Sequence, residues 1–375
     1  MSHKLSIFYT FDVFDPDGAE PWSRRAVQLM TAFGDRARHV VAAQDCRGTL
    51  PPGVRGELAQ VVPPLTGTVS VARYEAIARA MRGHDLVLSH GAGAIDAVMA
   101  RRAFPRDAPP IVHHEDPAAA TVGGSARLYR RIALGAAAGL VVSGTAAAEP
   151  ARARWKVAAD RVHAIPDGVD LPAYARVPDA KAVAGFRRKP SDVVIGVVAD
   201  RSGADDIALL VRAVAGLAAR FRLVVIGAVD GGETRAAVER AALAMGIDDR
   251  LLLPGAIAPA ARYLGGFDVL LLPMRGGPAP AIVVEAMAAG LPVMALRGSG
   301  AEGVLSAENG ALLSPFAAEV PLRDALQPLA TDAGLRAQVG AANRARAAAM
   351  HDGAAMIARS AAVYAAAMGK PGILG

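Results

Sequence analysis

Residues 273–290, PMRGGPAPAIVVEAMAAG, lie between two apolar runs, VLLL at 269–272 and LPVMAL at 291–296. Two short apolar runs on either side of helix-forming residues predict a strand, a helix and a second strand. The helix is expected to begin near Ala279 and to end at Gly290, because glycine readily adopts the backbone conformation that terminates a helix.

Glu285 is the only charged residue between Arg275 and Arg297. The predicted helix around it is otherwise apolar on all sides, which indicates that it is buried between layers. A buried carboxylate is unfavourable unless hydrogen bonds stabilise it. The partner could be a polyol ligand or a neighbouring backbone segment, and this stretch favours neither.

Length and composition predict a two-domain α/β protein: the chain has 375 residues, of which 53% are apolar and 20% charged. A single cysteine, Cys46, excludes an internal disulfide. The first apolar run is too short for a signal peptide, and no run approaches the roughly 20 apolar residues of a membrane-spanning helix. We therefore expect a cytoplasmic protein.

The net charge of +6 comes mainly from arginine, which suits phosphate or carboxylate recognition, or an anionic membrane surface. The segment ARLYRRIALGAAA at 126–138 concentrates this charge on a predicted helix. Its arginines are expected to form mainly a solvated face, with peripheral contact at the inner face of the membrane as a secondary interpretation. Aromatic residues are sparse and do not alternate with basic runs, so nucleic-acid binding is not expected.

Predicted strands alternate with predicted helices in two series, which indicates two parallel-sheet domains that face each other across a cleft. We expect an N-terminal domain at 1–170, a polar, proline-containing linker at 171–192, and a C-terminal domain at 193–350. The last residues, 351–375, are expected to form a helix and tail that pack back on the N-terminal domain. Ligands of such folds bind at the carboxyl ends of the strands.

The turn DPDGAE at 15–20 follows the first predicted strand and precedes the first predicted helix. Ligands bind at this position in many α/β folds, because the N–H groups of the helix N-terminus point there. Gly18 and Glu20 are therefore candidate ligand-site residues. An ordinary turn explains the segment equally well.

Two histidine-containing segments follow later predicted strands. His90 precedes Gly91 and Gly93, but the third glycine of a dinucleotide-binding motif is missing, and the segment is not in the first βα unit, so we reject a nicotinamide site. The four residues HHED at 113–116 cannot all converge on one ion, which argues against a metal site. A ligand-facing His113 at the carboxyl edge of the sheet is the preferred interpretation.

Several motifs occur in a characteristic order. The strongest are IVVEAMAAG at 282–290, followed by LPVMA, and ENG at 308–310. The others are DGAE at 17–20, VVS at 141–143, IPDGVDL at 165–171, RLVVIG at 222–227, DR at 249–250 and FDVLLLP at 267–273. Together they resemble the GT-B-fold retaining glycosyltransferases of family 4, also called glycosyl transferases group 1, over essentially the whole chain.

The resemblance implies two Rossmann-like domains, with a nucleotide-sugar donor bound mainly by the C-terminal one and a glycan, lipid-linked or other small acceptor by the N-terminal one. It also implies transfer with retention of configuration, in polysaccharide or glycolipid biosynthesis. No metal, other cofactor or protein nucleophile is expected, because the departing diphosphate takes the proton of the acceptor. No catalytic residue is therefore assigned.

The same resemblance suggests binding residues. Glu285 matches the second Glu of an E-x7-E motif, which binds the nucleotide ribose, and Arg201 matches an arginine that neutralises the diphosphate. The loop around the phosphates and sugar would contain Gly276, Gly277, Ala279, Ala281 and Ile282. The acceptor side or cleft would contain Gly18, Glu20, His90 and His113.

The chain departs from the family pattern at the expected donor site. Gly277 replaces the first Glu of the motif, Pro278 and Pro280 remove two N–H donors, and Asp205 falls near the position of a phosphate-binding lysine. Loss of one charge-stabilising group typically lowers the rate by about 10²–10³-fold. Two main hypotheses stay open: an active transferase with an altered donor site, or a catalytically inactive GT-B-like protein that acts as a binding or assembly partner. A third, another GT-B chemistry such as sugar epimerisation, would need catalytic carboxylates and histidines that the sequence does not place.

Overall fold

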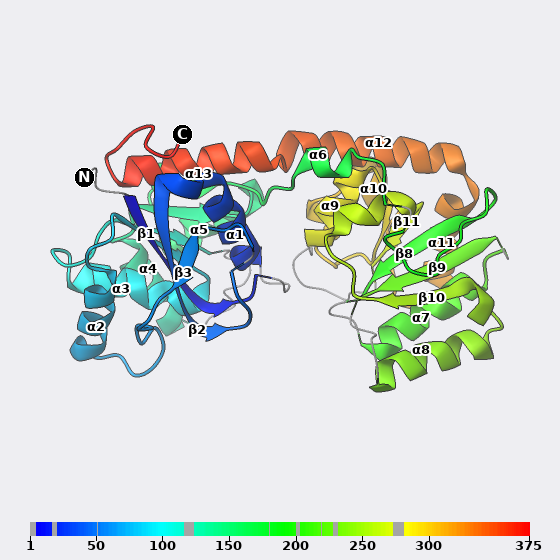
Figure 1. The fold of residues 1–375 in the computed structure, drawn as a ribbon, viewed down its shortest axis with the longest axis horizontal. Helices are drawn as coiled ribbons and strands as arrows, with labels where there is room; N and C mark the ends of the chain where they lie inside the picture. The colour runs from blue at the N-terminus through cyan, green and yellow to red at the C-terminus, as the bar shows by residue number, and fades with distance from the viewer. Residues whose placement is uncertain are drawn as a thin grey trace. The chain divides into compact units, whose positions relative to one another are not determined.

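The computed structural model forms two compact units (Figure 1). The described residues are 5–16, 21–50, 52–115, 124–179, 181–199, 203–218, 220–227, 232–272 and 281–375. The first unit comprises Met1–Gly168 and Gly353–Gly375, and the second comprises Val169–Asp352. Each contains a parallel sheet covered by helices, which confirms the predicted fold class of two Rossmann-like domains.

The first unit contains a seven-stranded sheet in the order β3-β2-β1-β4-β5-β6-β7, with parallel pairing throughout. Its strands are β1 (Leu5–Phe14), β2 (Ala37–Cys46), β3 (Gly56–Leu58), β4 (Leu86–His90), β5 (Ile111–His114), β6 (Gly139–Val142) and β7 (Val162–Ala164). Its helices are α1 (Pro21–Phe33), α2 (Val71–Met81), α3 (Ile95–Ala103), α4 (Gly124–Leu134), α5 (Thr145–Trp155) and α13 (Gly353–Ala367).

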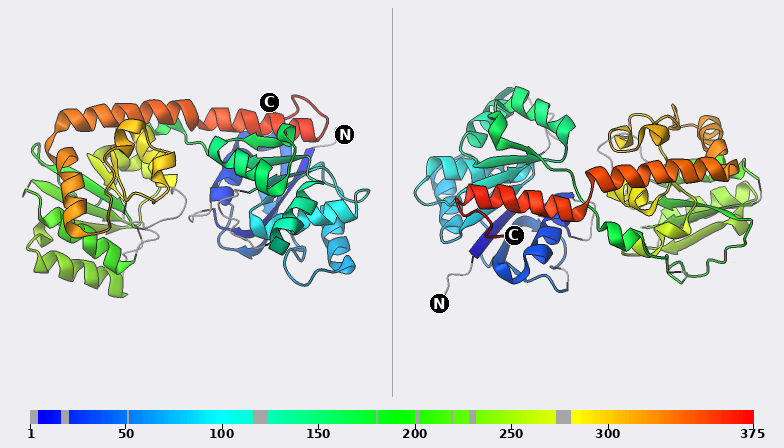
Figure 2. Two further views of the ribbon diagram at one scale, coloured as in Figure 1. Left: turned by 180° about the vertical axis from the view of Figure 1, so that it is seen from behind. Right: turned by 90° about the horizontal axis from the view of Figure 1, so that it is seen from above.

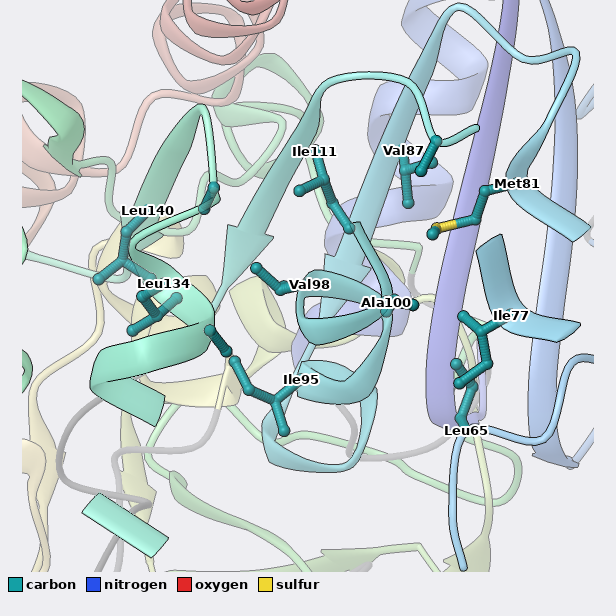
Figure 3. Packing of buried hydrophobic residues seen from close by; sticks show 14 of the residues in the cluster. Leu65, Ile77, Met81, Val87, Ile95, Val98, Ala100, Ile111, Leu134 and Leu140 are labelled. Atoms are coloured by element: carbon teal, nitrogen blue, oxygen red, sulfur yellow. The ribbon is translucent and has the colours of Figure 1, made fainter. Parts of the chain in front are cut away.

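Helices cover both faces of this sheet. On one face α2, α3, α4 and α5 pack over a cluster that includes Ile77, Val98 and Leu134 (Figure 3). On the other face α1 and the C-terminal helix α13 enclose a second cluster, which includes Leu29 and Tyr364. Burial on both sides explains why the strands are nearly continuous apolar runs.

The second unit contains a five-stranded parallel sheet in the order β10-β9-β8-β11-β12. Its strands are β8 (Val193–Val198), β9 (Phe221–Ile226), β10 (Leu251–Gly255), β11 (Val269–Leu271) and β12 (Val293–Met294). Its helices are α6 (Leu171–Tyr174), α7 (Ala204–Ala215), α8 (Gly232–Ala244), α9 (Ala281–Ala289), α10 (Ala307–Gly310), α11 (Glu319–Thr331) and α12 (Ala333–Met350). Helices α7, α8 and α11 cover one face, and α9 and α12 contribute to the cluster on the other (Figure 2).

Short 3-10 helices complete the two units. They are Gly34–Arg36, Ala92–Ala94, Ala159–Arg161, Asp248–Arg250, Ala260–Arg262, Leu264–Gly266 and Ala301–Gly303.

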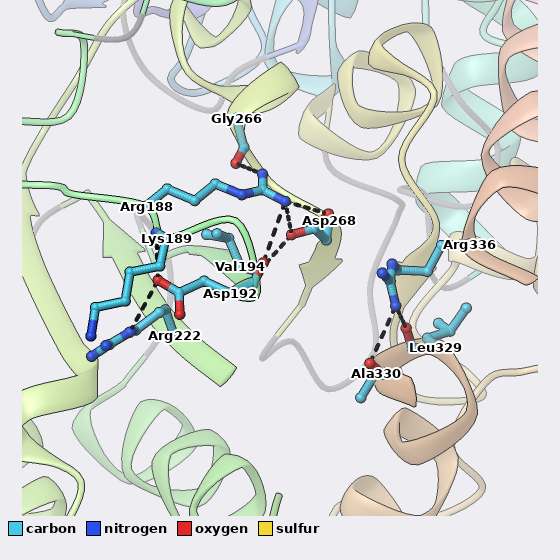
Figure 4. Close-up of polar contacts among 10 residues, drawn as sticks. All are labelled: Arg188, Lys189, Asp192, Val194, Arg222, Gly266, Asp268, Leu329, Ala330 and Arg336. Carbon is cyan, nitrogen blue, oxygen red and sulfur yellow. Dashed lines mark hydrogen bonds and ion pairs between the residues drawn. The ribbon is translucent and has the colours of Figure 1, made fainter. Parts of the chain in front are cut away.

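The segment at 171–192, predicted as a linker, is assigned to the second unit, and its basic end is bound there. The guanidinium of Arg188 donates hydrogen bonds to both carboxylate oxygens of Asp268, at 3.0 and 2.9 Å, and to the carbonyl of Gly266 at 3.2 Å (Figure 4). Asp268 also accepts a 2.7 Å bond from the backbone N–H of Val194. The arginine therefore joins this segment to the starts of β8 and β11.

Two buried asparagines complete the short edge strand β12. The N–H and C=O of Val293 point away from β11, and both bond to the side-chain amide of Asn309, at 2.8 and 2.6 Å. The amide of Asn343 donates to Asn309 Oδ1 at 2.7 Å and to the carbonyl of Leu291 at 2.8 Å. These contacts satisfy backbone groups that the two-residue strand would otherwise leave unpaired.

Helices α9 and α12 approach each other closely at Gly290 and Gly340. A Cβ on Gly340 would lie 2.1 Å from the carbonyl oxygen of Gly290, which itself adopts a φ of +76° at the end of α9. Arg344 donates a 2.8 Å hydrogen bond from the next turn of α12 to the carbonyl of Ala289. Only a residue without a side chain fits at position 340 in this arrangement.

Gly340→Ala should lower the free energy of unfolding by about 1–3 kcal/mol, because the added methyl group displaces α12 from α9. Urea unfolding followed by circular dichroism measures the loss. The matched control is Gly310→Ala, where no atom lies within 4 Å of the added Cβ. Equal stability of the two variants would contradict the packing argument.

Candidate functional site

The predicted donor-side residues that the structure describes lie on α9. This helix follows β11 at the carboxyl edge of the second sheet, and Ala281 and Ile282 form its first turn. Glu285, in the second turn, is 6% exposed, and most of the side chains around it are also buried. The N-terminal N–H groups of a helix lack partners within the helix and carry a partial positive charge, which favours anions.

The other predicted donor residues, Arg201, Gly276, Gly277 and Ala279, lie outside the described residues, as do Gly18 and Glu20 on the acceptor side. Asp205 is described, and it lies exposed in the first turn of α7. A carboxylate at this place stabilises the helix through its dipole. That interaction is a structural reason for an acidic residue there.

The first unit brings His90 and His113 together at the carboxyl edge of its sheet. His90 ends β4 and His113 lies in β5, and the register pairs Ser89 with His113 and His90 with His114. Both histidines were predicted as acceptor-side residues, a role that stays a prediction. His114 was not selected from the sequence, although it occupies the end of β5.

His90 is the central ring of an aromatic stack. The centroid of its ring lies 4.5 Å from that of Phe11, with an angle of 6° between the ring planes. The centroid of the His114 ring lies 4.3 Å away, with an angle of 19° between the planes. The ring centroid of Trp22, at the start of α1, lies 6.4 Å from that of His90 and 6.0 Å from that of His114. His90 is 2% exposed, and within the described residues neither of its ring nitrogens has a hydrogen-bond partner. Within the described residues its ring therefore has unused hydrogen-bonding capacity.

His113 belongs to a hydrogen-bonded chain that is already complete. Its Nδ1 lies 2.8 Å from Ser89 Oγ, and its Nε2 lies 3.2 Å from a carboxylate oxygen of Glu115. Glu115 also accepts from the guanidinium of Arg130 at 3.0 Å. A serine, histidine and carboxylate in this order can serve nucleophilic catalysis, but Ser89 and His113 are completely buried. The chain instead holds β4, β5 and α4 together.

The carboxyl group of Glu115 stays ionised in this environment. Burial alone would raise its pKa, but the hydrogen bond from His113 and the charge of Arg130 hold the pKa below its ordinary value.

His90 and His114 stay neutral for the opposite reason. Burial lowers the pKa of each imidazole well below its ordinary value, and the nearby Arg25 guanidinium lowers the pKa of each further. Arg25 is itself buried and donates to the carbonyl of Ile165 at 2.9 Å and to Asp167 at 3.2 Å. A neutral imidazole can both accept and donate a hydrogen bond, so the edge suits a hydroxyl-bearing ligand.

Among the described residues, no group of three or more His, Cys, Asp or Glu side chains is placed to hold a metal ion. The expectation that the reaction needs no metal or other cofactor stays a prediction. No helix in the described part of the chain is long and apolar enough to cross a membrane.

The second unit matches a family model. The model described as Glycosyl transferases group 1 matches residues 192–332. A D-inositol 3-phosphate glycosyltransferase of Xylanimonas cellulosilytica is 33% identical over 199 residues, which are 50% of this chain and 47% of that relative. The chain thus spans about half the length of this curated relative in the match.

Solved structures resemble the whole chain. The HepE protein of Anabaena, solved in complex with UDP, has a TM-score of 0.73 at 17% identity and covers 95% of this chain and 98% of its own. Sucrose-phosphate synthase of Thermosynechococcus elongatus has a TM-score of 0.69 at 20% identity, with 96% and 98% covered. At these identities the likeness establishes a shared fold.

Acidification should destabilise the protein, because His90 and His114 are neutral when folded and become protonated on unfolding below the ordinary histidine pKa of about 6.5. Each should lower the free energy of unfolding by up to about 1.4 kcal/mol per pH unit as the pH falls from this value toward the lowered folded-state pKa. His90→Phe preserves a stacked ring without a titrating group. It should reduce the dependence of the unfolding free energy on pH by the contribution of one histidine. Urea unfolding at several pH values measures both slopes, and identical slopes would contradict the assignment.

Proposed function

We propose that the chain, whose residues 192–332 match the family model of the group 1 glycosyl transferases, moves a sugar from a nucleotide-sugar donor to a hydroxyl-bearing acceptor with retention of configuration. The family resemblance found in the sequence is confirmed by the match at residues 192–332. The observation that carries the proposal is the buried Glu285 on α9, inside the matched region.

In the proposed donor site, Glu285 binds the two ribose hydroxyls. A carboxylate that accepts from hydroxyls makes charge-assisted hydrogen bonds, each stabilising by about 1.5–3 kcal/mol. The start of α9, with Ala281 and Ile282, lies beside the diphosphate, where the helix dipole favours negative charge. Arg201, Gly276, Gly277 and Ala279 are proposed for the same site. Support comes from the HepE structures of the same fold, which contain UDP and UDP-glucose.

In the proposed acceptor site, the neutral ring of His90 binds an acceptor hydroxyl. The supporting observation is its buried ring, whose nitrogens have no partner within the described residues. Gly18, Glu20 and His113 are proposed to line or support the same site. The curated relative is named for D-inositol 3-phosphate, a polyol, so a polyol or glycan hydroxyl is the acceptor that we favour.

Peripheral contact with the inner face of the membrane is proposed through α4. Its outward face contains Arg127, Leu128, Arg131 and Ile132, all exposed, with Leu128 at 55% and Ile132 at 40%. Leucine and isoleucine four residues apart lie on one side of a helix, with an arginine next to each. An anionic lipid surface suits this combination of apolar and cationic groups, and it would give a lipid-linked acceptor access to the protein.

A nucleotide that occupies the donor site should stabilise the protein. At about 100 times its dissociation constant, UDP, GDP or ADP should add roughly 2.7 kcal/mol to the free energy of unfolding, which thermal denaturation detects. Glu285→Ala should abolish the shift, whereas Glu308→Ala, at an exposed position, should retain it. Unliganded melting curves show whether each variant is folded.

The outcome also separates the active-transferase hypothesis from the inactive-partner hypothesis for this chain. A shift with one nucleotide, lost only in Glu285→Ala, supports the donor site and identifies the base. No shift with any nucleotide or sugar conjugate would refute the donor site and favour an inactive binding or assembly partner.

Replacing Arg127 and Arg131 with alanine should weaken binding to phosphatidylglycerol-containing vesicles by about fivefold per arginine, since each cation contributes about 1 kcal/mol near an anionic surface. Vesicle flotation measures the bound fraction, and added salt should reduce it for the unmodified chain. Arg240→Ala, at an exposed position on α8, is the control for a general loss of positive charge. Equal binding of all variants would contradict a role for α4.

A further inference from the structure

The C-terminal helix α13 reaches the histidine edge of the first unit through one hydroxyl group. Tyr364 is completely buried, and its hydroxyl lies 2.8 Å from Nε2 of His114, 250 positions earlier in the sequence. The two rings meet edge to face, with centroids 5.8 Å apart. The last helix is therefore in direct contact with the ring on which His90 is stacked.

The polar partners of His114 determine which nitrogen carries its proton. Its Nδ1 lies 3.3 Å from the carbonyl oxygen of Ser89, which can only accept, so Nδ1 is protonated and donates. In the neutral ring Nε2 is then an acceptor, and the Tyr364 hydroxyl donates to it. Burial raises the pKa of Tyr364, so the hydroxyl keeps the proton that it donates.

The tyrosine hydroxyl has further support within the first unit. It makes a hydrogen bond with Ser360, one turn earlier on α13. Ser360 Oγ lies 3.5 Å from the guanidinium of the buried Arg25. The Tyr364 side chain is thus held from its own helix as well as by the packing around it.

We infer that Tyr364 is a positioning residue: the hydrogen bond that it donates fixes the ring plane of His114 and, through the 4.3 Å stack, the orientation of His90 in the acceptor site. This inference rests on the proposed function. Phenylalanine at position 364 would fill the same space but leave the buried Nε2 unpaired. The Ser89 carbonyl keeps the proton on Nδ1, so the His114 ring responds by rotating out of its plane, and this rotation alters the support of His90.

The first test observes the ring nitrogens of His114 in the full-length chain labelled with ¹⁵N-histidine. Two-bond ¹H–¹⁵N correlation spectra distinguish the protonated from the unprotonated ring nitrogen, and His114→Gln and His90→Phe assign the signals. The unmodified chain should show Nδ1 protonated in His114. Tyr364→Phe should keep Nδ1 protonated, shift the Nε2 signal of His114, which loses its hydrogen-bond donor, and shift the ring signals of His90.

Tyr129→Phe is the matched control, because the hydroxyl of Tyr129 on α4 bonds to Asp96 and to the hydroxyl of Tyr74, not to a histidine. It should leave the ring signals of both histidines unchanged. Unchanged His114 signals in Tyr364→Phe would overturn the inference. Equal changes in both variants would also overturn it, because they would reflect general loosening of the unit.

Kinetics connect the orientation of the two histidine rings to the acceptor site and separate this inference from the proposed function. With UDP-glucose as donor and myo-inositol as acceptor, Tyr364→Phe should lower kcat/KM for the acceptor by about tenfold and leave KM for the donor within about twofold. Shifted ring signals with an unchanged acceptor kcat/KM would overturn the connection to the acceptor site. If the unmodified chain shows no turnover and no nucleotide binding, the proposed function fails, and the spectra alone decide whether Tyr364 fixes His114.

Discussion

Burial of both faces of each parallel sheet is the constraint on which the rest of the structure depends. Side chains within the strands must be apolar or have their polar groups satisfied, since no water reaches them. Buried polar side chains of the first unit therefore occur where β4 and β5 end. There the side chains of His113 and Glu115 already have hydrogen-bond partners. His90 differs, because the described residues give its ring nitrogens no partner. The acceptor site that we propose at this edge rests on that difference.

Local sequence patterns predicted most of the fold. The run at 269–272 predicted a strand, observed at Val269–Leu271, and the helix expected from about Ala279 begins in the described residues at Ala281. The alanine-rich residues near the C-terminus are divided into three helices, α11, α12 and α13. Asp332 begins the second of these by accepting a hydrogen bond from the N–H of Leu335, a cap that the sequence could have indicated.

Residues of the candidate site were predictable only where a local sequence pattern within one segment indicated their position. His90 and His113 follow apolar runs, and that position alone places them at the carboxyl edge of the sheet. The contact of His114 with Tyr364 joins residues 250 positions apart, so no local pattern reveals it. Arg25 resembles any surface arginine of a helix in the sequence, yet it is buried by packing that involves α13. Tertiary contacts of this kind cannot be derived from propensity or spacing.

The hydrogen bonds between the Asn309 amide and β12 also have a consequence for self-association. An edge strand normally presents free N–H and C=O groups, to which a strand of another molecule can add. At Val293 both groups are occupied by a side chain of the same molecule, which reproduces the hydrogen bonds of a neighbouring strand without extending the sheet. The two asparagines that complete the second unit thus also protect this edge against intermolecular β-pairing and aggregation.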